Sequence, residues 1–258
     1  MAARDGISAA IGAAVAHGRP ALVGFLTAGF PSRENFKRNL AEVASACDVV
    51  EIGVPFSDPM ADGSTIQRAS FAALGNGVTL QWILDELLAG QKRTAPILLM
   101  SYLNPLLAFG LGRLPSAAAA AGVSGFIVPD LPFEESADLK SALDREGLAL
   151  VQMVTPVTPP ARLEMLCAAA QGFVYAVTMT GTTGKSAEVP DSVLEYMDRV
   201  KRCSPVPVCA GFGIRSRAQV ERFGSHVDGV VVGSALVEAL ERGDDVAAFL
   251  RSLRQGGG

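Results

Sequence analysis

Short apolar runs alternate with amphipathic stretches along the whole chain. The apolar runs are rich in β-branched residues, as buried strands are, and they cover residues 21–26, 49–52, 97–101, 125–128, 148–154, 173–177, 206–210 and 229–232. The amphipathic stretches have helical spacing and include residues 33–46, 134–146, 160–170, 191–202 and 216–223. Strand and helix alternating eight times, with strands apolar on both faces, predict one (β/α)8 TIM barrel domain over residues 1–258. A doubly wound open sheet is the alternative architecture.

Two segments depart from this alternation. Residues 7–17 are rich in alanine and predict an extra N-terminal helix rather than a signal peptide, because no basic start precedes a clean apolar block. The step from Ile52 to Ile97 is nearly twice as long as most others and begins with a long loop of Pro, Asp and Gly, residues 53–63. Loops that follow strands form the active face of such a barrel, so this loop is a candidate lid. The alternative is an extra turn in which Asp58 and Asp62 are ordinary turn or capping residues.

The composition of the chain disfavours membranes, nucleic acids and metal ions as partners. The hydrophobic fraction is 49%, but Gly, Pro or charged residues interrupt the apolar runs before the roughly 20 residues that span a bilayer. A formal net charge of −4 without a long basic cluster disfavours a nucleic-acid groove. Four cysteines without C-x-x-C spacing and only two histidines favour reduced thiols and disfavour a zinc site. We therefore expect a soluble, cytoplasmic protein with no metal and no membrane or nucleic-acid partner.

Three glycine-containing loops follow the last three predicted strands, at residues 181–184, 211–213 and 233–234. Barrels commonly bind a phosphate on the loops after strands seven and eight and at a short helix N-terminus, where free amides and the helix dipole meet the anion. A small phosphate ligand is therefore expected at this end of the barrel. Its expected contacts are Thr183, Gly184, Gly213, Gly233 and Ser234.

Residues 180–186, TGTTGKS, look like the end of a nucleotide-triphosphate loop. That motif requires a glycine where this chain has Met179, so the match fails. The segment is instead predicted to form one wall of the phosphate site, with Lys185 as an outer charge. Lys185 is also the one lysine near a predicted strand end, which makes imine-forming aldolase chemistry a less favoured alternative.

Two carboxylates, Glu51 and Asp62, are predicted to lie in different environments, one in a strand and one in a loop. Glu51 lies inside an apolar strand, where a charged carboxylate is costly to bury and usually has a purpose, a partner or a raised pKa. The alternative is a strand-end residue that reaches solvent. Asp62 lies in the long loop that follows. Such pairs divide acid and base duties, and the sequence therefore predicts acid–base carbon chemistry without a cofactor.

Residues 51–63, EIGVPFSDPMADG, closely resemble the signature of the tryptophan synthase alpha subunit family. The resemblance continues through residues 130–136, 181–184, 211–213 and 233–234 and covers nearly the whole chain. It implies a lyase of tryptophan biosynthesis that cleaves indole-3-glycerol phosphate into indole and glyceraldehyde 3-phosphate, with no cofactor in this subunit. It also implies a heterotetramer with a beta subunit that carries pyridoxal phosphate.

The resemblance also implies roles for individual residues. Glu51 would protonate the indole ring carbon that bears the side chain, and it would later accept the proton of the neighbouring hydroxyl. Asp62 would take the indole N–H proton. Residues expected to enclose the indole ring are Phe25, Met100, Tyr175 and Phe212. Each of these four, taken alone, is more often a core residue than a pocket residue.

Two positions depart from the family pattern. Met179 stands where an arginine is common, and Thr182 stands where a valine often precedes the last Thr-Gly. Both bear on how the Thr183 loop closes and how strongly it responds to a partner. A stand-alone lyase that releases free indole and a mainly activating subunit remain as alternatives, and intact Glu51 and Asp62 favour a lyase. A further alternative is a sugar-phosphate isomerase or epimerase, which would use the same phosphate site without an indole-sized pocket.

Overall fold

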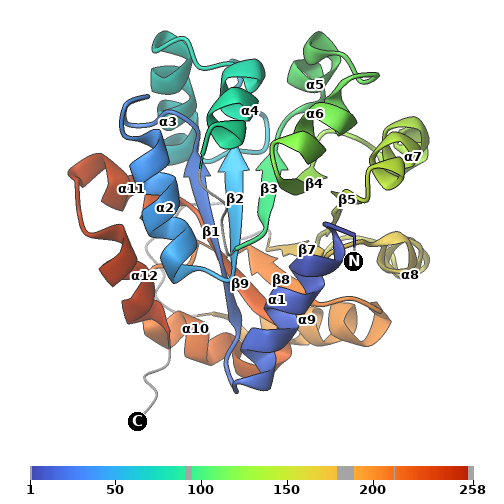
Figure 1. The fold of residues 1–258 in the computed structure, drawn as a ribbon. Coiled ribbons are helices and arrows are strands. Elements are labelled where there is room, and N and C mark those ends of the chain that lie inside the picture. The colour runs from blue at the N-terminus through green and yellow to red at the C-terminus, as the bar shows by residue number, and fades with distance from the viewer. Residues whose placement is uncertain (1, 91–94, 179–188, 212, 255–258) are drawn as a thin grey trace.

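The chain folds into a closed parallel β-barrel (Figure 1). The computed structural model describes residues 2–90, 95–178, 189–211 and 213–254. Its nine strands are all parallel and follow the order β5-β4-β3-β2-β1-β9-β8-β7-β6. The two end strands of this order, β5 and β6, are consecutive in the chain and separated only by Val151. The sheet therefore closes on itself, and the predicted barrel is confirmed over the open-sheet alternative.

The strands coincide with the predicted apolar runs. They are β1 (Ala21–Thr27), β2 (Val49–Gly53), β3 (Ile97–Met100), β4 (Val123–Ile127), β5 (Ala149–Leu150), β6 (Gln152–Val154), β7 (Val174–Val177), β8 (Val208–Gly211) and β9 (Gly229–Val232). The run predicted as one strand over residues 148–154 is divided in two, because its first half pairs with β4 and its second half pairs with β7.

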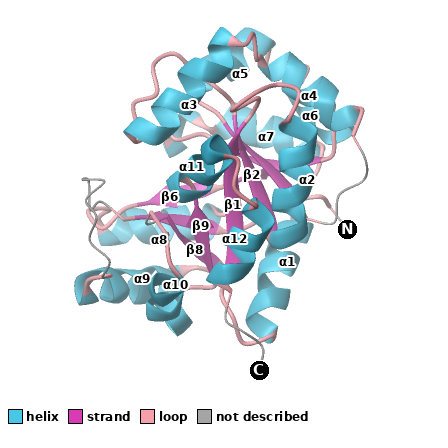
Figure 2. Cartoon of the chain, turned by 90° about the vertical axis from the view of Figure 1, so that its left-hand side faces the viewer, coloured by secondary structure: helices cyan, strands magenta, loops and turns pink. Residues whose placement is uncertain are grey.

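Helices surround the barrel, as Figures 1 and 2 show. They are α1 (Asp5–Ala16), α2 (Phe36–Ala46), α3 (Ser64–Gly75), α4 (Leu80–Leu88), α5 (Leu103–Phe109), α6 (Leu114–Ala120), α7 (Ala137–Arg145), α8 (Pro160–Ala169), α9 (Asp191–Cys203), α10 (Arg217–Phe223), α11 (Ser234–Arg242) and α12 (Val246–Leu253), with short 3-10 turns at Phe133–Glu135 and Gly224–His226. The long step between β2 and β3 thus contains a loop, residues 54–63, and then two helices. None of the helices in the described ranges has the length and apolarity to cross a membrane.

Side chains alternate across each strand, as the period of two requires. On β1, Leu22 and Leu26 belong to the apolar layer that packs against the surrounding helices. Val23 and Phe25, between them, belong to the clusters inside the barrel. Because both faces are covered, every residue of β1 is buried. This double burial explains why the strands are continuous apolar runs rather than alternating ones.

The predicted extra helix, α1, closes one end of the barrel. Its buried residues Ile7, Ile11 and Ala14 pack against Ala21 and other inward-facing strand residues. Figures 1 and 2 place α1 at the end of the barrel opposite α3 and α5. The carboxyl ends of the strands therefore form the end that remains for a binding site, as in other barrels of this class.

Candidate active site

Glu51 lies on the inner face of β2 and is completely buried, with 0% exposure. Its neighbours in register are Phe25 on β1 and Leu98 on β3. Neither carboxylate oxygen has a hydrogen-bond partner among the described residues. Burial, and to a lesser degree the charge of Asp62, raise the pKa of Glu51 to about 8. The carboxyl group is therefore mainly protonated at pH 7, which is the state a general acid requires. It is not a strand-end residue that reaches solvent.

Asp62 lies at the end of the loop between β2 and α3, and it is only partly buried. Burial raises its pKa to about 6, while a hydrogen bond from the Tyr102 hydroxyl group acts in the opposite direction. The Gln67 side chain of α3 donates to the Asp62 backbone oxygen at 2.9 Å. Asp62 is therefore mainly ionised at pH 7. At pH 7 the pair consequently holds one neutral and one ionised carboxyl group.

Tyr102 belongs to this constellation, although it was absent from the sequence prediction. Its hydroxyl group accepts a hydrogen bond from the Ala61 N–H at 2.8 Å, and its ring contacts Phe56 with a centroid separation of 5.2 Å. Burial, and next the charge of Asp62, raise the pKa of Tyr102 to about 12. Its place just after β3 at the carboxyl end of the barrel was the available signal. Tyr102 thus anchors the loop that carries Asp62.

The predicted indole-binding residues that the structure describes lie on the inner face of the barrel around Glu51. The Phe25 ring lies over Gly53, where an added Cβ would come within 2.5 Å of the ring. The Tyr175 ring lies over Gly211 in the same way, also at 2.5 Å. The two glycines therefore leave room for the two rings.

Two methionines extend this apolar wall. Met100, at the end of β3, packs against the cluster that contains Phe25. Met153 of β6 pairs in register with Tyr175 and is a further inward-facing residue that the sequence prediction omitted. Burial is the main reason that the pKa of Tyr175 lies well above its usual value, and the charge of Glu51 is the second. These apolar side chains and Glu51 therefore lie close together inside the barrel. Phe212 lies outside the described residues.

The structure describes three of the predicted phosphate contacts, Gly213, Gly233 and Ser234. Gly233 precedes α11, and Ser234 is the first residue of that helix, so free N–H groups of its first turn lie at this end of the barrel. An added Cβ on Gly233 would meet no atom closer than 4.0 Å, and one on Gly213 would meet none within 4 Å. Gly213 has a φ of 57°, which favours glycine. Thr183 and Gly184 lie outside the described residues, as do Met179 and Thr182.

The family model of the tryptophan synthase alpha chain matches residues 11–254 of this chain. The chain belongs to this family. Curated tryptophan synthase alpha chains from Solidesulfovibrio magneticus and Nitratidesulfovibrio vulgaris are similar to it, at 48% and 45% identity. Each alignment covers 93% of this chain and about as much of the relative, 95% and 94%.

Solved structures of this family share the fold. Mycobacterium tuberculosis tryptophan synthase superposes with a TM-score of 0.88 at 37% identity and covers 96% of both chains. The alpha subunit from Legionella pneumophila superposes with a TM-score of 0.87 at 30% identity, over 98% of this chain and 97% of the other. These similarities extend over the whole barrel rather than one motif.

Membership of the alpha chain family defines the reaction class. The family reaction is the cleavage of a carbon–carbon bond in indole-3-glycerol phosphate, which releases indole and glyceraldehyde 3-phosphate for tryptophan biosynthesis. The alpha chain of the family uses no cofactor, and its partner, the beta subunit, carries pyridoxal phosphate. This chain is accordingly a cofactor-free lyase. In the described part of the chain, no three His, Cys, Asp or Glu side chains are grouped closely enough to hold a metal ion.

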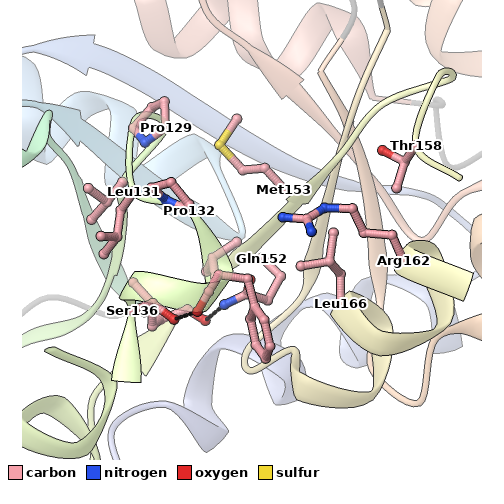
Figure 3. Close-up of a pocket in the computed structure, with 13 residues that line it drawn as sticks. Pro129, Leu131, Pro132, Ser136, Gln152, Met153, Thr158, Arg162 and Leu166 are labelled. Atoms are coloured by element: carbon pink, nitrogen blue, oxygen red, sulfur yellow. Dashed lines mark hydrogen bonds between the residues drawn. The ribbon is translucent and has the colours of Figure 1, made fainter. Parts of the chain in front are cut away.

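A cavity of about 150 Å³ lies between the segment that follows β4 and residues of β5, β6 and α8. Figure 3 shows the Arg162 side chain extending across it towards Met153. Its mixed lining includes Gln152 and Ser136 besides apolar residues. Met153 lines both this cavity and the apolar wall of the candidate site, but neither Glu51 nor Asp62 lines the cavity.

Proposed function

We propose that Glu51 and Asp62 carry out the cleavage of indole-3-glycerol phosphate in this chain as the acid–base pair. The observation that supports this most strongly is a fully buried carboxyl group without a described hydrogen-bond partner, whose pKa of about 8 keeps it protonated at pH 7. A protein buries such a group at a cost in stability, and catalytic sites are where this cost is found most often.

The proposed mechanism begins with proton transfer to the ring. Protonated Glu51 gives its proton to the indole carbon that bears the glycerol phosphate chain, while ionised Asp62 takes the proton from the ring nitrogen. The ring loses its aromaticity and gains a C=N bond that can accept electrons. Glu51 is now a carboxylate in an apolar setting, which makes it a strong base.

Cleavage of the carbon–carbon bond then returns Glu51 and Asp62 to their starting protonation states. Glu51 accepts the proton of the hydroxyl group on the adjacent side-chain carbon, and the carbon–oxygen bond there becomes the aldehyde of glyceraldehyde 3-phosphate. The electrons of the broken carbon–carbon bond return to the ring, and Asp62 returns its proton to the ring nitrogen. The proton first supplied by Glu51 stays on the indole carbon, so the reaction leaves both carboxyl groups as they began.

The substrate is proposed to lie along the inner face of the barrel, with its phosphate at the α11 end. The indole ring would contact Phe25, Met100 and Tyr175, and Phe212 as well. The phosphate would receive N–H groups at Gly213, Gly233 and Ser234, together with Thr183 and Gly184. The apolar walls support a lyase over a sugar-phosphate isomerase, because a small sugar phosphate has no aromatic ring to enclose.

The test of this proposal is indole release by the purified chain across pH 5 to 9. We expect kcat/KM to follow a bell-shaped curve, because the reaction needs ionised Asp62 and protonated Glu51 together. Activity should fall below the Asp62 pKa of about 6 as that carboxylate becomes protonated. It should fall again above the Glu51 pKa of about 8 as that acid ionises. A rate that keeps rising from pH 8 to pH 9 would contradict the role of Glu51 as the acid.

The partner is proposed to be the tryptophan synthase beta subunit, in an alpha2beta2 heterotetramer. Three large apolar side chains from separate segments that follow strands are exposed: Met60 by 81%, Leu107 by 50% and Val157 by 73%. Because they follow β2, β3 and β6, they lie at the end of the barrel that carries the site. Exposed apolar side chains at this end of the barrel support a protein interface there. The cytoplasm is the proposed location, and the four free cysteines fit a reducing compartment.

We expect Leu107→Asp and Val157→Asp to weaken the binding of a family beta subunit by at least about tenfold, because each places a charge in an apolar contact. Indole release by the isolated variants should match that of the unsubstituted chain. Val15→Asp is the matched control, since Val15 is 42% exposed on α1 at the other end of the barrel. Isothermal titration of the beta subunit measures the affinities. The absence of binding by the unsubstituted chain would favour a stand-alone lyase.

A further inference from the structure

Glu238 joins three segments that surround the candidate site. Its carboxylate accepts two hydrogen bonds from the Arg215 guanidinium group, at 2.7 and 2.9 Å. It also accepts one from the Thr65 hydroxyl group at 3.2 Å. The hydrogen bonds from Arg215 are the main cause that lowers the pKa of Glu238. The carboxylate is therefore ionised throughout the neutral range, and the connection is charge-assisted.

Each of the three segments carries a different part of the site. Glu238 lies one helical turn after Ser234, at the start of α11. Arg215 lies two residues after Gly213 in the loop that follows β8. Thr65 lies in the first turn of α3, three residues after Asp62. One carboxylate thus connects both described phosphate loops to the segment that carries the proposed base.

The other ends of these segments are anchored independently. The Arg215 N–H donates to the Gln219 side chain of α10 at 2.8 Å, and Gln219 also completes a capping box with Ser216. On the other side, Gln67 holds the Asp62 backbone. Glu238 is therefore one of the contacts between the two sides of the site, and it also binds the loop that follows β8. A change there alters their relative position more than their separate folding.

We propose that Glu238 is a positioning residue that sets the distance between the phosphate end of the site and Asp62; this inference rests on the proposed function. A substrate held at its phosphate presents its ring to Asp62 only if this distance is correct. Errors of about 1 Å in such placement cost reaction rate without breaking the fold. The ion pair is half exposed at Arg215, so its contribution to stability is small.

The chain supplies a matched control in the pair Arg68–Glu241. Arg68 of α3 donates to Glu241 of α11 at 3.2 and 2.6 Å. This pair joins the same two helices as Thr65 and Glu238 and is similarly exposed. Glu241 has no hydrogen bond or ion pair with the loop after β8 among the contacts in the described residues. Arg68 also interacts electrostatically with Glu238, but we expect the loss of Glu241 to remove only the Arg68–Glu241 ion pair and to leave the hydrogen bonds from Arg215 to Glu238 in place.

The decisive comparison is between Glu238→Gln and Glu241→Gln. We expect Glu238→Gln to raise the KM for indole-3-glycerol phosphate by about 3–10-fold, a range between the values of exposed and charge-assisted contacts. It should lower kcat as well, because a displaced phosphate end presents the ring to Asp62 less well. Glu241→Gln should leave KM and kcat unchanged. Both variants should have closely similar thermal midpoints. Equal kinetics for the two variants would overturn the proposal.

Two further variants test the contacts of Glu238 with Arg215 and with Thr65 separately. Arg215→Gln should reproduce the rise in KM, because it frees the loop that carries Gly213. Thr65→Val should lower kcat by about 2–5-fold at unchanged KM, as expected for the loss of a single weak hydrogen bond. An unchanged kcat for Thr65→Val would contradict the inference that the Thr65–Glu238 hydrogen bond helps to position Asp62.

Binding of sn-glycerol 3-phosphate, measured by titration, tests Glu238 without turnover. We expect Glu238→Gln to bind this phosphate ester about 3–10-fold more weakly than Glu241→Gln does. Tighter binding would mean that Glu238 withholds Arg215 from the phosphate, and it would overturn the proposal. If the unsubstituted chain released no indole, the proposed function would be wrong, and this titration would still decide whether Glu238 positions the phosphate end.

Discussion

Replacement of Glu51 by glutamine is expected to lower kcat for indole release by about 10²–10⁴-fold. Glutamine has almost the same size as glutamate, but it can neither supply the proton that the ring carbon needs nor accept the hydroxyl proton afterwards. Both steps depend on this one group in the proposed mechanism. The KM should change little, because the phosphate loops do not involve Glu51. Retention of more than about a tenth of the activity would contradict the assignment.

The pH dependence of the free energy of unfolding shows whether the Glu51→Gln variant is folded. Folding raises the pKa of Glu51 from 4.5 to about 8, so the folded state favours the protonated form. The stabilising effect is fully present below pH 4.5 and is lost as the pH rises through about 8. At about 1.4 kcal/mol for each pKa unit, the loss is on the order of 4 kcal/mol.

Glutamine does not titrate and therefore escapes this loss. Urea unfolding at pH 5 and pH 9 should show the free energy of unfolding of Glu51→Gln rising relative to the unsubstituted chain as the pH increases. An inactive variant with this pH dependence is folded and lacks only the acid. A parallel pH dependence in the two proteins would show that Glu51 is not a buried neutral acid.

Replacement of Asp62 by asparagine is expected to lower kcat by about 10²–10³-fold. Asparagine can still accept the hydrogen bond from Tyr102, so the loop should keep its position, but it cannot take the proton of the ring nitrogen. The alkaline limb of the pH profile should also move to lower pH, because the charge of Asp62 contributes to the raised pKa of Glu51. Steady-state assays from pH 5 to 9 measure both effects.

Asp58→Asn is the matched control for Asp62→Asn. Asp58 is exposed on the same loop, and its side chain accepts a hydrogen bond from the neighbouring Ser57 hydroxyl group at 2.5 Å. We expect this variant to keep the basal rate of the isolated chain. If Asp62→Asn lost substrate binding together with rate, Asp62 would be a structural residue of the loop rather than the base.

The architecture of the barrel was predictable from the sequence because its signals are local. A strand covered on both faces needs a continuous apolar run, and each such run in this chain forms strand in the structure. Glu51 was predictable for the same reason, since one carboxylate in an apolar run must either be buried or disrupt the strand. The division at Val151 was not predictable, because it depends on which neighbour each half pairs with after the barrel closes.

The details of the candidate site depend on contacts between residues far apart in the chain. Tyr102 reaches Ala61 across 41 positions, and Glu238 reaches Thr65 across 173. No local pattern encodes such pairs, because they form only when the closed sheet brings its strand ends together. The pKa of Glu51 likewise depends on the surrounding walls and on Asp62. The sequence by itself thus determined the strands, their alternation with helices and the presence of a carboxyl group that is costly to bury. Closure of the barrel decided which groups surround Glu51 and which contacts hold Asp62 in place, because those groups are far apart in the chain.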